Sequence, residues 1–170
     1  MTSSEILEHG LHDLGLNLLK GETSETLHSI QLSAEDLLIG LAEHDDARLR
    51  MALIPLFLYR PEIADVVPDV LEDLKAPGRK TIKLFYTSAV ILQEIHRERL
   101  REFVSSRKDL PDYFSEELGV AAVGNPQDRL RILGKRHKEL TGKTANWWGT
   151  YQHAAKRLLS RLEKEAAWAA

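Results

Sequence analysis

Residues 80–107 have the sequence KTIKLFYTSAVILQEIHRERLREFVSSR, the longest helical pattern in the chain. Apolar residues recur in it at spacings of three and four, which places them along one side of an α-helix. One stripe contains Ile82, Phe85, Ala89 and Leu92, and a wider surface adds Leu84, Ile91 and Ile95. A helix with so wide an apolar surface must pack against neighbours on more than one side. We therefore predict that residues 80–107 form the central helix of an all-α domain.

Helical periodicity extends over most of the remaining chain. It predicts further helices at about residues 4–20, 33–43, 45–59, 61–74, 127–140 and 144–166. Ser33 is suited to cap the second of these, Asp45-Asp46 begins the third, and Pro55 and Pro68 should bend the helices that contain them. Residues 109–126 are irregular, apart from a short helix expected from Ser115. No strand-like alternation is present, so we predict six or seven helices, packed as an irregular bundle or in a HEAT-like array.

The composition excludes several classes of protein. The chain has 170 residues and no cysteine, which removes disulfide scaffolds, Cys-ligated metal sites and thiol nucleophiles. Its longest apolar run, residues 52–59, contains Pro55 and is far shorter than the roughly 20 residues that span a bilayer. The first residues are polar and acidic rather than those of a secretory signal. We expect a cytoplasmic protein that does not interact with membranes.

Charge is divided unevenly along the sequence. Residues 1–75 contain 15 acidic and 5 basic residues, a balance of −10, whereas residues 76–170 contain 11 acidic and 18 basic residues, a balance of +7. The change of sign coincides with Lys75-Ala-Pro-Gly78, which has the composition of a break between helices. Because the central helix needs cover from the first half, we predict one domain over residues 1–170 with an acidic half and a basic half.

Residues 45–74 resemble a single HEAT-type helical repeat. The match consists of an Asp-containing turn at Asp45-Asp46, the Leu49-Arg50 pair, the small residue Ala52, an apolar tail and a second helix from Pro61. In HEAT proteins these positions are structural. The resemblance implies helix-pair packing and, more loosely, contacts with other proteins. Repeat arrays need about three units for stability, and the sequence contains one.

The segment Asn146-Trp-Trp-Gly-Thr-Tyr-Gln-His-Ala-Ala-Lys-Arg-Leu-Leu159 is similar to a group of small uncharacterised bacterial proteins, some of them encoded beside nucleotidyltransferases. The resemblance implies an all-helical partner subunit or antitoxin-like protein. It assigns no role to individual residues.

Arg131 and His137 fit the spacing of the arginine and histidine of helical HEPN ribonucleases. In such a site the arginine stabilises charge on the phosphorane and the histidine transfers a proton. Ile132 departs from the pattern, because these enzymes usually have a polar residue after the arginine. His137 also shares an apolar helix face with Leu133 and Leu140, and this position equally fits a hydrogen-bonded histidine at the edge of the core.

A basic face is the second candidate site. Its residues, at helical spacing, are Lys135, Lys138, His153, Lys156, Arg157, Arg161 and Lys164. These side chains would bind a protein partner or nucleic acid, or else form an ordinary solvated face. The nearby Trp147, Trp148 and Tyr151 lie at spacings typical of core residues.

The remaining motifs predict no cofactor. Leu140-Thr-Gly-Lys-Thr144 resembles the end of a phosphate-binding loop but lacks the first glycine, and we expect a helix end at Gly142 followed by a cap at Thr144. His9, His12 and Asp13 could share a helix face, and Glu43-His44-Asp45-Asp46 forms a separate cluster whose aspartates begin a helix, yet a complete set of metal ligands is missing. We predict neither a metal nor another cofactor.

Three functions agree with these patterns. The first is a non-enzymatic helical interaction module with a protein partner or a second copy of itself, such as one subunit of a bacterial two-protein module. The second is RNA or DNA binding through the basic face of residues 127–164. The third is a HEPN-like ribonuclease.

Overall fold

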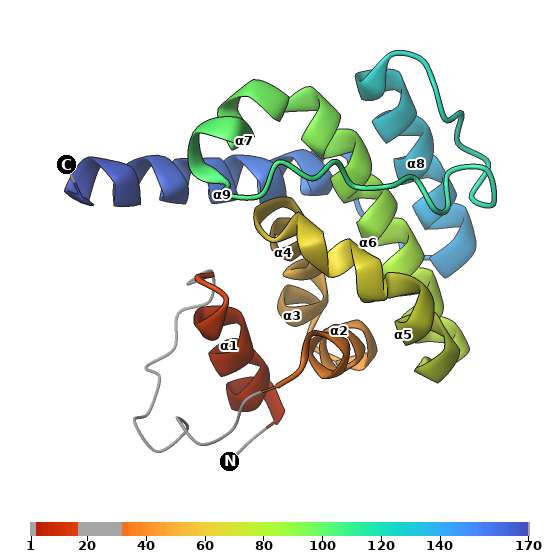
Figure 1. Ribbon diagram of the computed structural model, residues 1–170. Helices are drawn as coiled ribbons and strands as arrows, with labels where there is room; N and C mark the ends of the chain where they lie inside the picture. The colour runs from red at the N-terminus through yellow and green to blue at the C-terminus, as the bar shows by residue number, and fades with distance from the viewer. Residues whose placement is uncertain (1–2, 17–31, 170) are drawn as a thin grey trace.

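The computed structural model describes residues 3–16 and 32–169, and every regular element in these ranges is helical (Figure 1). The predicted all-α class is therefore confirmed. The central helix and the six further helices predicted from periodicity are present, but three of them are broken in two, as α3–α4, η2–α5 and α6–α7. The elements in chain order are α1 (Ser3–Asp13), α2 (Ala34–Glu43), α3 (Ala47–Met51), α4 (Leu53–Tyr59), the 3₁₀-helix η2 (Pro61–Val66), α5 (Val67–Asp73), α6 (Ala76–Ile95), α7 (Arg97–Phe103), α8 (Pro126–Thr141) and α9 (Trp147–Ala169).

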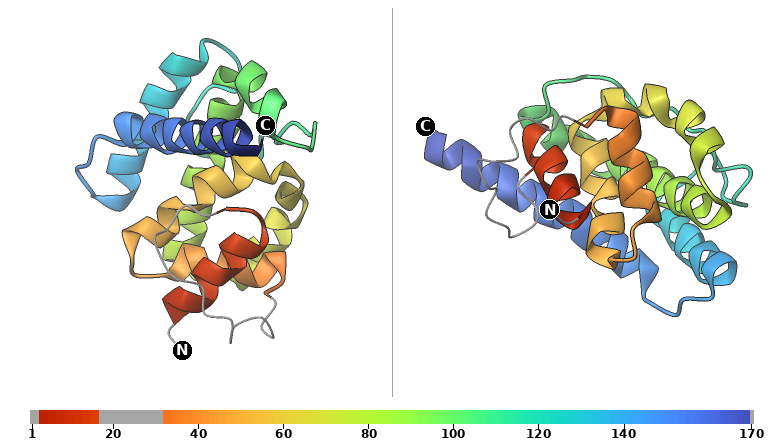
Figure 2. Two further views of the ribbon diagram at one scale, coloured as in Figure 1. Left: turned by 90° about the vertical axis from the view of Figure 1, so that its left-hand side faces the viewer. Right: turned by 90° about the horizontal axis from the view of Figure 1, so that it is seen from below.

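Helix α6 is the central helix, as predicted. It packs against α2, α4, α7, α8 and α9 (Figures 1 and 2). Its predicted apolar surface is buried, including Phe85 and Leu92. The helix begins at Ala76 rather than at residue 80, because Pro77 is tolerated in a first turn whose N–H groups have no helical partner. Residues 75–78 therefore begin the central helix and do not separate two domains.

One hydrophobic core joins the acidic and basic halves. The helices of the first half that cover α6 supply Leu38 and Ile54, and those of the second half supply Leu133 and Leu158. This continuity confirms the single compact domain for the described part of the chain. In residues 3–16 and 32–169, no helix is both long and apolar enough to cross a membrane.

The predicted caps and proline breaks determine the shape of the first half. The Ser33 hydroxyl accepts a hydrogen bond from the Asp36 N–H at 3.1 Å, and the Asp46 carboxylate accepts one from the Arg48 N–H at 2.9 Å. Pro55 lies three residues after the break at Ala52, and Pro68 lies in the first turn of α5, after the 3₁₀ segment. Both prolines remove a helical N–H, so each expected bend occurs as a change of helix.

Helix α1 is shorter than the sequence pattern suggests. It ends at Asp13 rather than near residue 20, and Gly15 follows with a φ of +88°, a left-handed conformation that stops the helix. Leu7 and Leu11 of the predicted stripe are buried. The fourth member, Leu18, lies outside the described residues.

The connection from α7 to α8 is irregular, as predicted, but its expected helix from Ser115 is a turn that ends at Gly119, where φ is +75°. Buried polar groups fix this connection to α6. Arg129 Nε donates to the Ala121 carbonyl at 2.6 Å and its Nη1 donates to Glu94 at 3.1 Å. The Tyr86 hydroxyl donates to the Pro111 carbonyl at 2.6 Å.

Helices α8 and α9 cross closely. Asn125 caps α8, and Gly142 ends it in a left-handed conformation, as predicted for the glycine of Leu140–Thr144. A Cβ atom on Gly134 would lie 3.1 Å from the backbone nitrogen of Trp148, so only glycine fits this crossing without movement. The close approach holds α9 against the body along its first half.

Candidate partner-binding groove

Helix α9 begins at a different residue from the one predicted. Asn146, not Thr144, caps the helix, because its side-chain oxygen accepts a hydrogen bond from the Gly149 N–H at 3.1 Å. The predicted apolar stripe is confirmed. Tyr151, Leu158 and Leu162 are buried, and Trp147 and Trp148 pack against the core. This face packs against α4, α6, α7 and α8, and no described helix is packed on the opposite face of α9.

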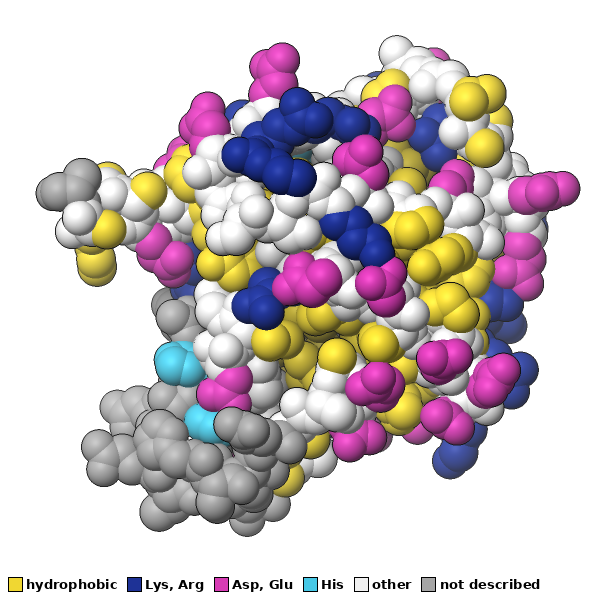
Figure 3. Space-filling model, in the orientation of Figure 1, with side chains coloured by type: hydrophobic (Ala, Val, Ile, Leu, Met, Phe, Trp, Pro, Cys, Tyr) yellow, Lys and Arg dark blue, Asp and Glu magenta, His cyan; other side chains and the backbone are white. Residues whose placement is uncertain are grey.

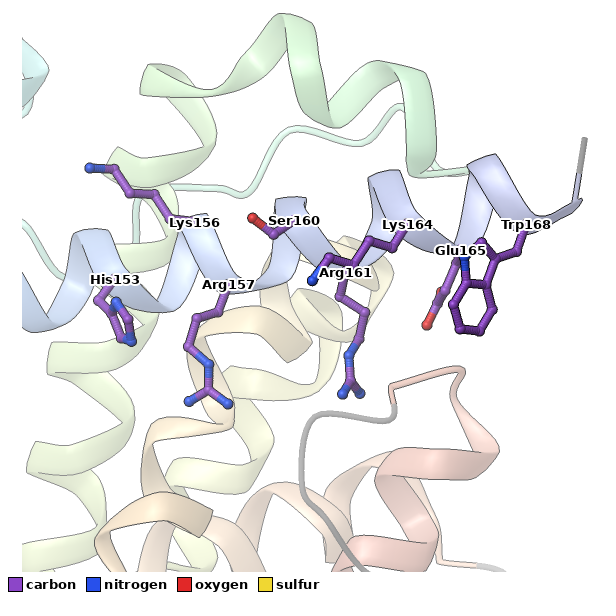
Figure 4. A pocket seen from close by; sticks show the side chains of 8 residues that line it. All are labelled: His153, Lys156, Arg157, Ser160, Arg161, Lys164, Glu165 and Trp168. Atoms are coloured by element: carbon purple, nitrogen blue, oxygen red, sulfur yellow. The ribbon is translucent and has the colours of Figure 1, made fainter.

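An open groove of about 620 Å³ follows that free face of α9. Figure 4 shows its lining side chains. His153, Arg157, Arg161, Glu165 and Trp168 extend downward from the helix in this view. Ser160 and Lys164 lie along the helix, and Lys156 extends upward from it. The final turns of α9 extend beyond the rest of the body (Figures 1 and 2).

The cations of this groove are not neutralised within the described part of the chain. There, none of Lys156, Arg157, Arg161 and Lys164 forms an ion pair, although the structure contains ion pairs elsewhere, such as Arg99 with Glu163. Glu165 is the single acid among the described lining residues. Arg161 Nη1 is shielded from solvent and has no hydrogen-bond partner. A buried donor without an acceptor costs free energy, which an incoming acceptor would restore.

Five of the seven residues predicted for the basic face line this groove, namely His153, Lys156, Arg157, Arg161 and Lys164. Lys135 and Lys138 do not line it, since they lie exposed on α8. The sequence interpretation missed Glu165 and Trp168. Trp168 follows Arg161 by seven residues, which is two helical turns, but the predicted helix ended at residue 166 and left it out.

His137 lies in a packed aromatic cluster. Its ring stacks on Trp147 with the ring centroids 3.5 Å apart, and its Nδ1 shares a hydrogen bond of 2.5 Å with the Tyr151 hydroxyl. The side chain is 4% exposed. Burial lowers the pKa of His137 to about 3, with a smaller effect from the charge of Lys143. The imidazole is therefore neutral at pH 7 and packed away from solvent.

Arg131 lies on the outer surface of α8. Its guanidinium is 4.7 Å from the centroid of the Trp148 ring and 3.7 Å from the Asp128 carboxylate. A ribonuclease would need this group and the His137 imidazole to face one phosphate. The burial of His137 favours its structural role, and the ribonuclease remains a prediction from sequence.

The histidines near the N-terminus contact neighbouring side chains and backbone groups. His9 Nε2 lies 3.6 Å from Asp13, and the rings of His9 and His12 stack. His44 Nδ1 accepts the Asp46 N–H at 3.0 Å, and its Nε2 lies 3.2 Å from Ser4 Oγ. Among the residues that the structure describes, no group of three or more histidine and acidic side chains has the arrangement of a metal site.

The chain matches no known protein family, and no curated protein or solved structure is significantly similar to it. The resemblances of residues 45–74 to a HEAT-type repeat and of residues 146–159 to small bacterial proteins remain predictions from sequence.

Proposed function

We propose that the protein is a non-enzymatic interaction module that binds an anionic partner along α9. The observation that carries this proposal is the groove, which Arg157 and Arg161 line without an ion-pair partner among the described residues. Exposed cations on a convex surface are ordinarily just solvated. Here they line a concave surface, where several positive charges act on one bound anion.

The distribution of charge over the molecule agrees with a site of this kind. In Figure 3 acidic side chains gather around α5, and Asp69, Glu72 and Asp73 are exposed there. An anionic partner would be repelled by this region and attracted by α9. Charge complementarity of this kind selects the orientation and increases the rate of association.

If the anionic partner is a protein, the chain is one subunit of a two-protein module, the role that the resemblance of residues 146–159 implies. A partner held by charge-assisted contacts to two arginines separates at high salt, because exposed ion pairs are screened. A second copy of the chain, pairing α9 with the acids around α5, would satisfy the same contacts.

Mild affinity purification of the full chain from its host, followed by measurement of the native mass, tests the proposal. We expect the wild type to retain a partner at low salt and to lose it at high salt. The variant that combines Arg157→Glu with Arg161→Glu should be recovered without a partner. Lys135→Glu combined with Lys138→Glu makes the same change of charge outside the groove and should retain the partner.

Two results would contradict the proposal. One is a wild type recovered alone at every salt concentration. The other is a partner that the Arg157→Glu/Arg161→Glu variant retains as well as the wild type does. A native mass of twice 19.3 kDa that falls to one chain in the groove variant would identify the partner as a second copy.

A further inference from the structure

We infer that the anionic partner in the α9 groove is a single-stranded nucleic acid, whose phosphates contact Arg157 and Arg161 and one of whose bases stacks on Trp168. This inference rests on the function proposed above and specifies the class of ligand. It follows from the spacing of the cations, the exposure of Trp168 and the burial of one face of α9 against the body.

The spacing of the cations suits a chain of phosphates. Arg157, Arg161 and Lys164 follow one another along the helix at intervals of four and three residues. One helical turn advances about 5.4 Å, so a positive group occurs about once per turn on this side of the helix. An extended strand presents its phosphates at comparable intervals. The lining residues 153–168 span about 22 Å at a rise of 1.5 Å per residue, enough for several nucleotides.

Trp168 supplies the second element of a site for single strands. Its side chain is 89% exposed, and none of its described neighbours stacks on it. Its ring lies at the end of the row formed by Arg157, Arg161 and Glu165 (Figure 4). Proteins that bind single strands combine such aromatic surfaces with a positively charged groove, because every base has a face that can stack. An acidic polypeptide would use the arginines but has no comparable need for the exposed indole.

The packing of α9 favours a single strand over a duplex. A helix that reads a duplex enters the major groove, which requires that its sides be free. From Tyr151 to Leu162, however, α9 is buried against the body along one face. Arg157 and Arg161 extend from a different side of the helix (Figure 4). An extended strand can lie along that side, whereas the contact of the buried face with the body would prevent α9 from entering a major groove.

Titration of the full chain against fluorescein-labelled oligouridine and oligothymidine, each about 12 nucleotides long, tests the inference by fluorescence anisotropy. Binding to either strand should weaken as salt rises, because each phosphate contact on a single strand contributes about −0.7 to the slope of log K against log salt. Arg157→Glu combined with Arg161→Glu should lower the affinity roughly 100-fold or more. It should also reduce that slope by about 1.4, for two lost contacts.

Trp168 is tested separately. Trp168→Ala should lower the affinity roughly 5- to 150-fold, the range for loss of one stacked base. Trp168→Phe should keep most of the affinity but lose the quenching of tryptophan fluorescence on binding, because the other two tryptophans pack against the core. Lys135→Glu/Lys138→Glu serves as the charge control and should bind like the wild type. Circular dichroism checks that each variant is folded.

Equal binding of either strand to the wild type and to the Arg157→Glu/Arg161→Glu variant would overturn the inference. So would failure of both strands to bind while a polyglutamate peptide binds the wild type and not that variant. This second result would leave the proposed interaction module intact with an acidic protein as its partner. If neither strand nor polyglutamate binds and no partner is recovered from the host, both proposals fail.

Discussion

His137 shows how a single buried residue links the crossing of α8 and α9 to pH. It stacks on Trp147 and shares a hydrogen bond with Tyr151. Burial holds its pKa at about 3, whereas the imidazole of the unfolded chain has a pKa of about 6.5. Between these values the unfolded chain binds a proton that the folded chain does not. The contribution of the neutral imidazole to the free energy of unfolding is therefore fully present above pH 6.5, and it is lost as the pH falls toward 3.

The first prediction concerns this histidine. From pH 7 to pH 5 the free energy of unfolding should fall by about 2 kcal/mol through His137 alone. His137→Phe should remove that contribution, as measured by urea unfolding at both pH values. The variant leaves the Tyr151 hydroxyl without its partner, so it should be less stable at pH 7 by about 1–3 kcal/mol.

The double variant His137→Phe/Tyr151→Phe is the matched control, since it removes both polar groups and should recover part of that loss. A smaller dependence on pH should persist in both variants, because burial also lowers the pKa of His96. If His137→Phe loses as much stability between pH 7 and pH 5 as the wild type does, the imidazole is not a source of this acid lability.

At the scale of helices, the crossing of α8 and α9 determines which face of α9 remains free. Gly134 allows the backbones to approach so closely that a Cβ atom there would lie 3.1 Å from Trp148 N and 3.5 Å from Trp147 Cβ. The crossing packs Tyr151 and Leu158 inward. Because α9 is one continuous helix, this orientation places Arg157 and Arg161 in the groove. The groove thus depends on a glycine outside it.

The second prediction is that Gly134→Ala destabilises the protein by about 1–2 kcal/mol. Overpacking typically costs about 1–3 kcal/mol, and the better helix propensity of alanine offsets less than about 1 kcal/mol of it. Equilibrium unfolding in urea measures the change. Lys135→Ala, an exposed site on the same helix, should change stability by less than about 0.5 kcal/mol. An unchanged or increased stability of Gly134→Ala would show that the crossing adapts to a methyl group.

The same helices show what periodicity can and cannot predict. Spacing alone identified the buried faces of α6 and α9, because a residue's side of a helix follows from 3.6 residues per turn. It misplaced the ends of helices, because capping side chains and prolines determine them and periodicity does not. Pro77 suggested a break between helices but lies in the first turn of α6, and Asn146 rather than Thr144 caps α9. Trp168 was missed for this reason, since it lies in a turn beyond the expected end.

At the scale of the whole molecule, the contrast between the acidic and basic halves becomes a contrast between surfaces of one domain. The core is continuous from α1 to α9. Basic side chains also gather over α7, at the top of Figure 3. The sequence predicted the charge division and five of the groove residues. It placed Lys135 and Lys138 on the same face, because it cannot show that α8 and α9 cross and direct their cations to different sides.

The final prediction tests the central claim that α9 is the binding surface, whatever the partner. Acetylation of the complex recovered from the host, followed by mass spectrometry, measures the reactivity of each lysine. Lys156 and Lys164 should be protected in the complex relative to the free protein, while Lys135 and Lys138 in the same molecules should react equally in both. Protection of Lys135 and Lys138, with Lys156 and Lys164 still reactive, would contradict the account.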